Sequence, residues 1–244
     1  MESQTPEQLQ FISNVGHTIE GVLFAIVASI ALVQAMVYMR SKRAQYLWPS
    51  LIVIAGIFLP AYILLQRGFD QIGVSWNFVI NDPQQRQHIF MAFLLVVAGV
   101  AELAVRSKTV QGRLWKFVAP GALLVIGVTL LFHTQYGTPD AVAEAMRKHH
   151  YQGASVILVG LFRVADILWQ PRNKWLAYAW IIFLFVAAAL LITYREPYGA
   201  YRDGQWNPQL NTNAVLTGLG FESQNRNSVG IVTTRHRPHE GKRA

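Results

Sequence analysis

The sequence predicts an all-α membrane protein: a polytopic bundle of six transmembrane helices followed by a polar, mostly irregular C-terminal tail. The chain has 244 residues, of which 52% are hydrophobic and only 14% are charged, and its mean hydropathy is +0.27. Soluble domains carry about 25% charged residues, so these values exclude an ordinary soluble enzyme. The apolar residues also gather in runs near the length, about 20 residues, that a helix needs to cross a bilayer.

Short polar loops separate the six predicted spans. The spans cover residues 15–39, 48–65, 88–105, 115–133, 151–169 and 175–194. Thr138, Pro139 and Asp140 are typical of a helix start, so we expect the fifth helix to begin near Pro139 and to project beyond the membrane. The chain then divides into a polar N-terminal segment (1–14), a transmembrane domain (15–194) and a basic tail (195–244). Because segment 1–14 lacks the features of a cleaved signal peptide, we expect it to be retained.

Lysine and arginine are distributed unevenly between the two sides of the predicted bundle. The first, third and fifth loops carry nine of them, whereas the N-terminal segment and the second and fourth loops carry four. Cytoplasmic loops are enriched in these residues, so we expect both termini on the outer side, the periplasm if the source is a bacterium with the protein in its inner membrane. The net charge of +8 then reports orientation and predicts no nucleic-acid partner. The expected partners are the lipid bilayer and other membrane subunits or further copies of the chain.

Several kinds of chemistry are excluded by what the sequence lacks. With no cysteine, it has no disulfides, thiolate metal sites, iron–sulfur clusters or cysteine nucleophiles. It also has no glycine-rich phosphate loop, no dinucleotide-binding fingerprint and no Gly-x-Ser-x-Gly elbow, and we predict no catalytic residue. Any polar chemistry must therefore come mostly from histidine, carboxylate and methionine side chains.

Five of the seven histidines fall at the outer ends of the predicted spans: His17, His88, His133, His149 and His150. The other two, His236 and His239, lie in the tail, where we expect them to be solvated. Imidazole binds copper, zinc, iron and nickel, so five histidines at one depth predict a shared metal or haem site. Glu20 and Met91 follow His17 and His88 by three residues, which makes them candidate auxiliary ligands, and the methionine sulfur favours copper.

The odd-numbered spans share a weak repeat that strengthens this prediction. It places a histidine, two small residues and a charged residue at fixed spacing: His88, Ala92, Gly99 and Glu102 in the third span, and His149, Gly153, Gly160 and Arg163 in the fifth. The first span matches in part, with His17, Gly21 and Ala28. Small residues let membrane helices approach closely, so we expect these stripes to face one another and to bring the histidines together.

The charged positions of the repeat predict a buried ion-pair network. Glu102 and Arg163 occupy equivalent deep positions, and Arg106 and Asp166 lie nearby in the sequence. An unpaired charge at that depth costs at least a few kcal/mol, so the four side chains are expected to neutralise one another. A structural role is favoured for this network over a proton path.

The histidine pattern resembles that of the transmembrane protein 45 family of multi-pass membrane proteins. The matching pieces cover residues 16–168: Gly16-His17 with Gly21, Gln87-His88 through Gly99 to Glu102-Leu103, Phe132-His133-Thr134 with Gly137, and His149-His150 leading to Gly160 and Asp166-Ile167-Leu168. Two features depart from the family. Its His-x-His-Gly motif is replaced here by His133-Thr-Gln-Tyr-Gly137, and its usual further span is replaced by a polar tail. The resemblance implies a helical fold with inward-facing histidines and no particular reaction; a looser similarity to bacterial copper-resistance membrane proteins implies metal binding.

Three functions remain open at this point. The first is binding of a transition metal, copper or zinc, through the histidine cluster at the outer face. The second is electron transfer by a haem b whose axial ligands are two of these histidines. The third is a non-catalytic accessory subunit of a larger membrane complex.

Overall fold

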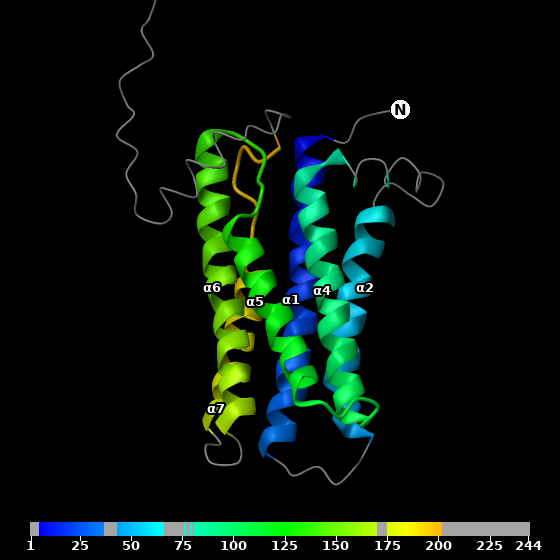
Figure 1. Ribbon diagram of the computed structural model, residues 1–244. Coiled ribbons are helices and arrows are strands. Elements are labelled where there is room, and N and C mark those ends of the chain that lie inside the picture. Colours follow the sequence, from blue (N-terminus) through cyan, green and yellow to red (C-terminus); the bar gives the residue numbers. More distant parts are fainter. Residues whose placement is uncertain are drawn as a thin grey trace, which may run out of the picture.

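The computed structural model describes residues 5–36, 43–65, 76, 79, 81–169 and 175–201. In this part of the chain, six helical segments are long and apolar enough to cross a membrane, which confirms the predicted all-α fold with six spans (Figure 1). The helices are α1 (Pro6–Met36), α2 (Leu47–Leu65), α4 (Pro83–Arg106), α5 (Val118–Leu131), α6 (Pro139–Trp169) and α7 (Trp175–Ile192). Two 3-10 turns, η1 (Ala44–Tyr46) and η3 (Arg113–Phe117), precede α2 and α5. The tail beyond residue 201, including His236 and His239, and the predicted end of the first span at 37–39 lie outside the described residues.

Helices α1 and α4 begin well before the apolar runs that predicted them. Thr5 and Gln8 cap α1 reciprocally, each backbone N–H donating to the other's side chain at 2.9 and 3.3 Å. The Asp82 carboxylate caps α4 by accepting from the Gln85 backbone N–H at 2.8 Å, with a proline at the first helical position. Most of the predicted N-terminal segment 1–14 is therefore helical, because capping residues extend a helix beyond its apolar stretch. The predicted start of the fifth span's helix at Pro139 is confirmed.

Helices α5 and α7 end earlier than predicted. α5 stops at Leu131 and α7 at Ile192, although the predicted spans reached 133 and 194. His133 and Tyr194 consequently lie in the loops that follow these helices.

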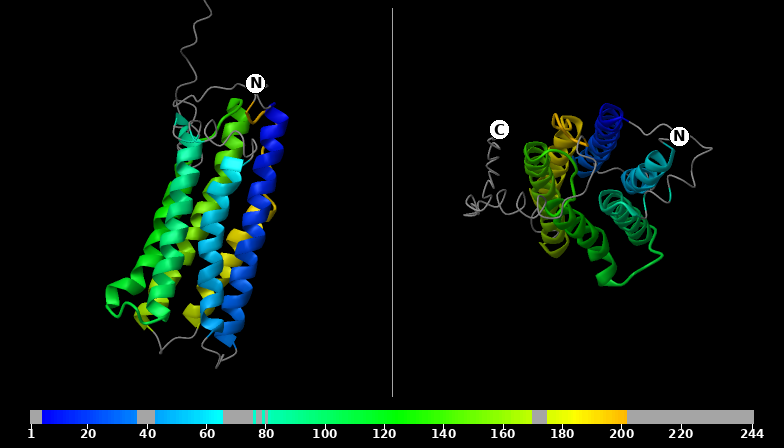
Figure 2. Two further views of the ribbon diagram at one scale, coloured as in Figure 1. Left: turned by 90° about the vertical axis from the view of Figure 1, so that its right-hand side faces the viewer. Right: turned by 90° about the horizontal axis from the view of Figure 1, so that it is seen from above.

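The six helices form a closed ring in chain order. Each helix packs against the next, and α7 packs against α1, as the view from above shows (Figure 2). Because consecutive spans run in opposite directions, the starts of α1, α4 and α6 lie at one end of the bundle (Figure 1). We call this the histidine end, since His17, His88 and His149 lie there. The opposite end, which contains Arg106 and Arg163, is the arginine end.

The small-residue stripes pack differently from the prediction. A Cβ atom added to Gly21 would lie 2.9 Å from the Ala188 carbonyl oxygen of α7, and one added to Gly99 would lie 2.8 Å from the Pro49 carbonyl oxygen of α2. The expectation that the stripes of α1, α4 and α6 face one another is thus wrong. In a closed ring each helix makes its close contacts with its two neighbours, so the stripes mark the flanks of the helices.

We expect Gly127→Ala to destabilise the bundle, because Gly127 of α5 and Gly153 of α6 pack backbone to backbone. A Cβ atom on Gly127 would lie 2.6 Å from Ile157 Cγ1 and 2.9 Å from the Gly153 carbonyl oxygen. Overpacking of this kind costs about 1–3 kcal/mol, which a thermal melt of the purified protein would record as a lower melting temperature. The control is Gly121→Ala, where nothing lies within 4 Å of the added atom. Alanine favours helix there, so equal melting temperatures for the two variants would contradict the packing described.

Candidate functional site

Four histidines meet at the histidine end of the bundle. The ring centres of His17 and His88 are 6.3 Å apart, and those of His17 and His149 are 6.2 Å apart. His133, in the loop after α5, lies 4.8 Å from His88 and 4.5 Å from His149 by the same measure. We call these four residues the histidine cluster. They come from four segments that are widely separated in sequence.

The three histidines on helices share one anchoring contact. The Nδ1 atoms of His17, His88 and His149 lie 2.8, 2.9 and 2.9 Å from the carbonyl oxygen of the residue four positions earlier in the same helix. A carbonyl oxygen can only accept a hydrogen bond, so Nδ1 carries the proton in each neutral ring. The lone pair is then on Nε2, the tautomer in which backbone-anchored histidines bind metal ions.

His133 is the least satisfied polar side chain of the cluster. It is 1% exposed, and neither ring nitrogen has a hydrogen-bond partner among the described residues. Burial, followed by the neighbouring imidazoles of His149, His88 and His17, lowers the pKa of His133 well below its ordinary value of 6.5. The ring is therefore neutral at physiological pH, and leaving its nitrogens unpaired costs about 1–3 kcal/mol.

Tyr194 closes the cluster from the side of α7. Its ring centre is 4.3 Å from that of His17 and 5.3 Å from that of His149, and its side chain is 2% exposed. No spacing pattern in the sequence connects Tyr194 with these histidines, because the contact forms only when α7 closes the ring against α1.

Glu196 links the segment after α7 to residues around the histidine cluster through hydrogen bonds. Its buried carboxylate accepts hydrogen bonds from three side chains: Ser13 at 2.7 Å, Gln135 at 3.1 Å and Tyr201 at 3.2 Å. Burial and the Glu196 carboxylate raise the pKa of Tyr201 well above its ordinary value, so this phenol stays protonated and donates. Ser13 Oγ is also 3.3 Å from His17 Nδ1, which links Glu196 to the cluster through one hydroxyl. Sequence reasoning missed this carboxylate, since it lies in a segment that otherwise reads as a polar tail.

His150, although adjacent to His149, lies apart from the cluster. Its Nε2 atom is 3.1 Å from the Leu131 carbonyl oxygen at the end of α5. Successive residues of a helix point about 100° apart, so the two neighbouring histidines of α6 face different directions. The structure thus brings together four of the five histidines singled out in the sequence.

Below the helical histidines lies a second layer of three side chains that could serve as ligands. Glu20, Met91 and Gln152 each follow one of these histidines by three residues. All three line one inner cavity of about 110 Å³ that also reaches His17, His88 and His149. Carboxylate, thioether and amide groups are therefore available within one helical turn of the imidazoles.

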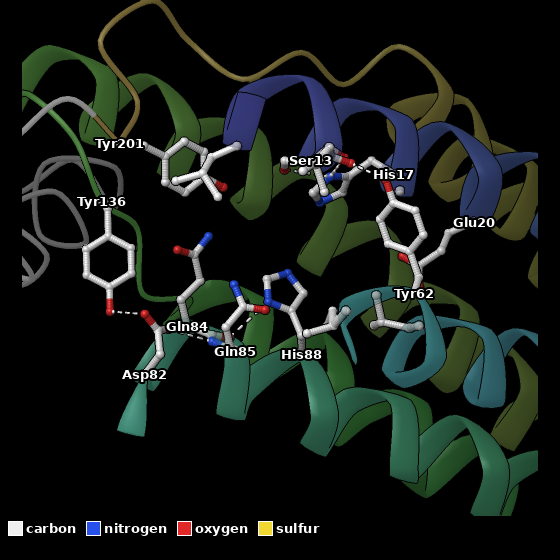
Figure 3. Close-up of a pocket in the computed structure, with 15 residues that line it drawn as sticks. Ser13, His17, Glu20, Tyr62, Asp82, Gln84, Gln85, His88, Tyr136 and Tyr201 are labelled. Atoms are coloured by element: carbon white, nitrogen blue, oxygen red, sulfur yellow. Dashed lines mark hydrogen bonds between the residues drawn. The ribbon is translucent and has the colours of Figure 1, made fainter. Parts of the chain in front are cut away.

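A larger cavity of about 270 Å³ lies between α1, α2 and α4 and reaches His17 and His88. In Figure 3 the hydrogen-bonded pair Tyr136 and Asp82 lies at one side of this outer cavity, and His17, Glu20 and Tyr62 lie at the other. His17, Glu20 and His88 line both cavities. The carboxyl groups of Asp82 and Glu20 therefore lie along the approach to the histidine cluster.

The four predicted charged residues form one connected network at the arginine end. Glu102 Oε1 is 2.9 Å from Arg106 Nε and 3.0 Å from Arg163 Nη2, and Arg163 Nη1 is 2.6 Å from Asp166 Oδ2. Their formal charges cancel, so the network holds no net charge. The guanidinium groups also stack on aromatic rings, Arg106 on Trp48 at 4.6 Å and Arg163 on Trp180 at 5.3 Å.

No protein-family model matches the chain, and no curated protein is similar to it at a significant level. The class that the fold defines is therefore a polytopic membrane protein with six candidate spans.

We expect the folded protein to lose stability on acidification in part through His133. The pKa of His133 is lower in the folded protein than its ordinary value of 6.5. Titration of this ring therefore leaves the free energy of unfolding unchanged above pH 6.5 and lowers it as the pH falls below that value. At pH 5.0 the loss reaches up to about 2 kcal/mol, which His133→Phe should remove. Melting temperatures at pH 7.5 and 5.0 for both proteins measure the difference. An equal drop in the melting temperatures of the two proteins would contradict a His133 ring that stays neutral in the folded protein.

Proposed function

We propose that this protein binds a transition-metal ion, with copper favoured, through His17, His88, His133 and His149 at the histidine end of the bundle. One observation carries the proposal: His133 is buried between two other imidazoles, and no hydrogen-bond partner for it lies among the described residues. Buried polar groups normally have a partner, and a bound metal ion would supply the partner that this ring lacks. Glu20 and Met91 serve as auxiliary ligands from the layer below.

The rings of the histidine cluster lie close enough to reach one shared ion, although they do not surround it as they are placed. Imidazoles bound through nitrogen at about 2.0 Å have ring centres between about 4.5 Å apart at a right angle and about 6.3 Å apart when opposed. The separations of His133 from His88 and His149, 4.8 and 4.5 Å, fall within this range. His17 lies 6.3 Å from His88 and 6.2 Å from His149, and it cannot be opposed to both rings around one ion. In the described part of the chain, no group of three or more His, Asp or Glu side chains is already arranged around a point that an ion could occupy. Binding therefore requires the rings to turn about their side-chain bonds toward a common centre.

The donor set favours copper over zinc. Imidazole serves both ions, while the buried thioether of Met91 next to the cluster selects the softer one. His17 lies 6.3 Å from His88 and 6.2 Å from His149, which is also the spacing of two imidazoles opposed across a haem iron. His133 lies only 4.8 Å from His88 and 4.5 Å from His149, and this crowding by a further ring favours a bare ion over haem b.

The proposal includes the orientation of the protein. With the basic loops at the arginine end in the cytoplasm, the histidine cluster faces the outside, and the outer cavity is the route by which an ion reaches it. The activity proposed is metal binding at the outer face of the membrane, without a catalytic step. The resemblance to the transmembrane protein 45 family supports the inward-facing histidines and adds no reaction.

Metal titration of the purified protein tests the ligand set. We expect one copper ion per chain, and loss of that ion in His88→Ala and His149→Ala. His150→Ala is the matched control, because the neighbouring ring contacts Leu131 and should leave the metal content unchanged, as should His239→Ala in the tail.

Unchanged metal content in the first two variants would refute the ligand assignment. A Soret band in the absorption spectrum would replace it with haem b. Absence of both, together with co-purification in fixed ratio with other subunits, would favour the accessory-subunit function instead.

The orientation is tested separately by single-cysteine labelling, which the absence of native cysteines makes clean. A membrane-impermeant maleimide applied to intact cells should label Asp140→Cys at the histidine end and leave Thr109→Cys at the arginine end unlabelled until the cells are opened. Both positions are exposed in the structure. The reverse pattern would place the histidine cluster in the cytoplasm.

A further inference from the structure

His17 has a contact that the other two helical histidines lack. Its Nδ1 atom lies 2.8 Å from the Ser13 carbonyl oxygen and also 3.3 Å from the Ser13 hydroxyl oxygen (Figure 3). Among the described residues, Nδ1 of His88 and Nδ1 of His149 each contact a backbone carbonyl alone. Because Nδ1 carries the proton, the N–H of His17 is shared between the two oxygens of Ser13, and the hydroxyl accepts from it.

The Ser13 hydroxyl connects His17 to the buried carboxylate of Glu196. It donates its own proton to Glu196 Oε1 at 2.7 Å, so imidazole, hydroxyl and carboxylate form one chain of hydrogen bonds. A carboxylate at the end of such a chain makes the other ring nitrogen, Nε2, a better donor to a metal ion. Loss of an outer partner of this kind typically lowers metal affinity by about 10- to 100-fold.

Glu196 also carries a negative charge that no cation balances in the part of the chain that the structure describes. The residue is 5% exposed, and none of the four ion pairs found there includes it. Its three side-chain partners, Ser13, Gln135 and Tyr201, all donate to it, and donors favour the charged form of a carboxylate. A buried charge without a partner is costly, so a cation in the histidine cluster would stabilise it.

We propose that Glu196 is a positioning residue for the copper ion, on which it acts through Ser13 and His17. This inference rests on the proposed metal site, because it names a residue that sets the affinity and the oxidation state of the same ion. The imidazole ligands are neutral when they bind. Glu20 and Glu196 together match the two positive charges of Cu(II) and exceed the single charge of Cu(I), so Glu196 favours the oxidised ion.

Copper titration of the full-length Glu196→Gln variant tests this role, since glutamine keeps the size of the side chain and removes its charge. We expect the Kd for Cu(II) to rise about tenfold and the Kd for Cu(I) to stay close to that of the wild type. The reduction potential of the bound copper then rises by about 59 mV, the value of a tenfold change for one electron. The control is Glu144→Gln, which removes a partly exposed carboxylate paired with Lys148 and should change neither affinity.

Ser13→Ala tests the connection, because it removes the hydroxyl and keeps the charge. It should raise the Kd for Cu(II) about fivefold, the value of one hydrogen bond. The double variant should bind Cu(II) no more weakly than Glu196→Gln, since both changes break the same chain. The control is Ser29→Ala, whose hydroxyl donates to the Ala25 carbonyl oxygen on an exposed part of α1 and should leave binding unchanged. Should Glu196→Gln fail to give a monodisperse protein, Ser13→Ala against this control decides.

Three results would overturn the positioning role and leave the metal site intact. The first is unchanged Cu(II) affinity in Glu196→Gln. The second is equal weakening of Cu(I) and Cu(II) at an unchanged potential, which indicates lost packing alone. The third is a double variant whose loss equals the product of the two single losses, because Glu196 would then act without Ser13. A wild-type protein that binds no copper would refute the proposed function, and this inference with it.

Discussion

The hydrogen bond from each helical histidine to its own helix is the contact on which the site depends. The Nδ1 protons of His17, His88 and His149 are held by backbone carbonyls at 2.8 to 2.9 Å. A carbonyl four residues back in a helix has a fixed position, so each ring has a fixed tautomer and a restricted orientation. The remaining nitrogen of each ring then has only the interior of the bundle, or a ligand there, to bind.

The bilayer determines where the other polar and apolar side chains lie in the bundle. Polar side chains gather at the two ends of the ring of helices, the imidazoles at one end and the neutral network of Glu102, Arg163, Arg106 and Asp166 at the other. Between them the interior is apolar, because uncompensated polar groups at membrane depth are costly. Glu196 joins the segment after α7 to α1 through Ser13, and so covers the histidine end. A covered, polar pocket at one end of an apolar bundle is the result.

The sequence alone predicted the six-span fold and the end of the bundle at which the histidines lie. Apolar runs predict the spans directly, since each must satisfy its backbone within one helix. Alternation of the spans then puts the histidines at one end. Helix limits were less accurate, because the caps at Thr5 and Asp82 extend polar ends that hydropathy does not register.

The remaining features of the site depend on tertiary packing. Periodicity shows that Gly21 and Gly99 share faces with histidines, but not which neighbour those faces meet. It turns His150 about 100° away from His149, but it does not show that His150 meets the Leu131 carbonyl oxygen at the end of α5. Tyr194 and Glu196 reach the site because α7 closes against α1, a contact with no local signature in the sequence.

X-ray absorption at the copper edge of the copper-loaded protein tests the central claim most directly. The account predicts three or four nitrogen scatterers at about 2.0 Å with the multiple-scattering pattern of imidazole rings. A spectrum without imidazole scattering, or with oxygen ligands alone, would show that the histidine cluster is not a metal site.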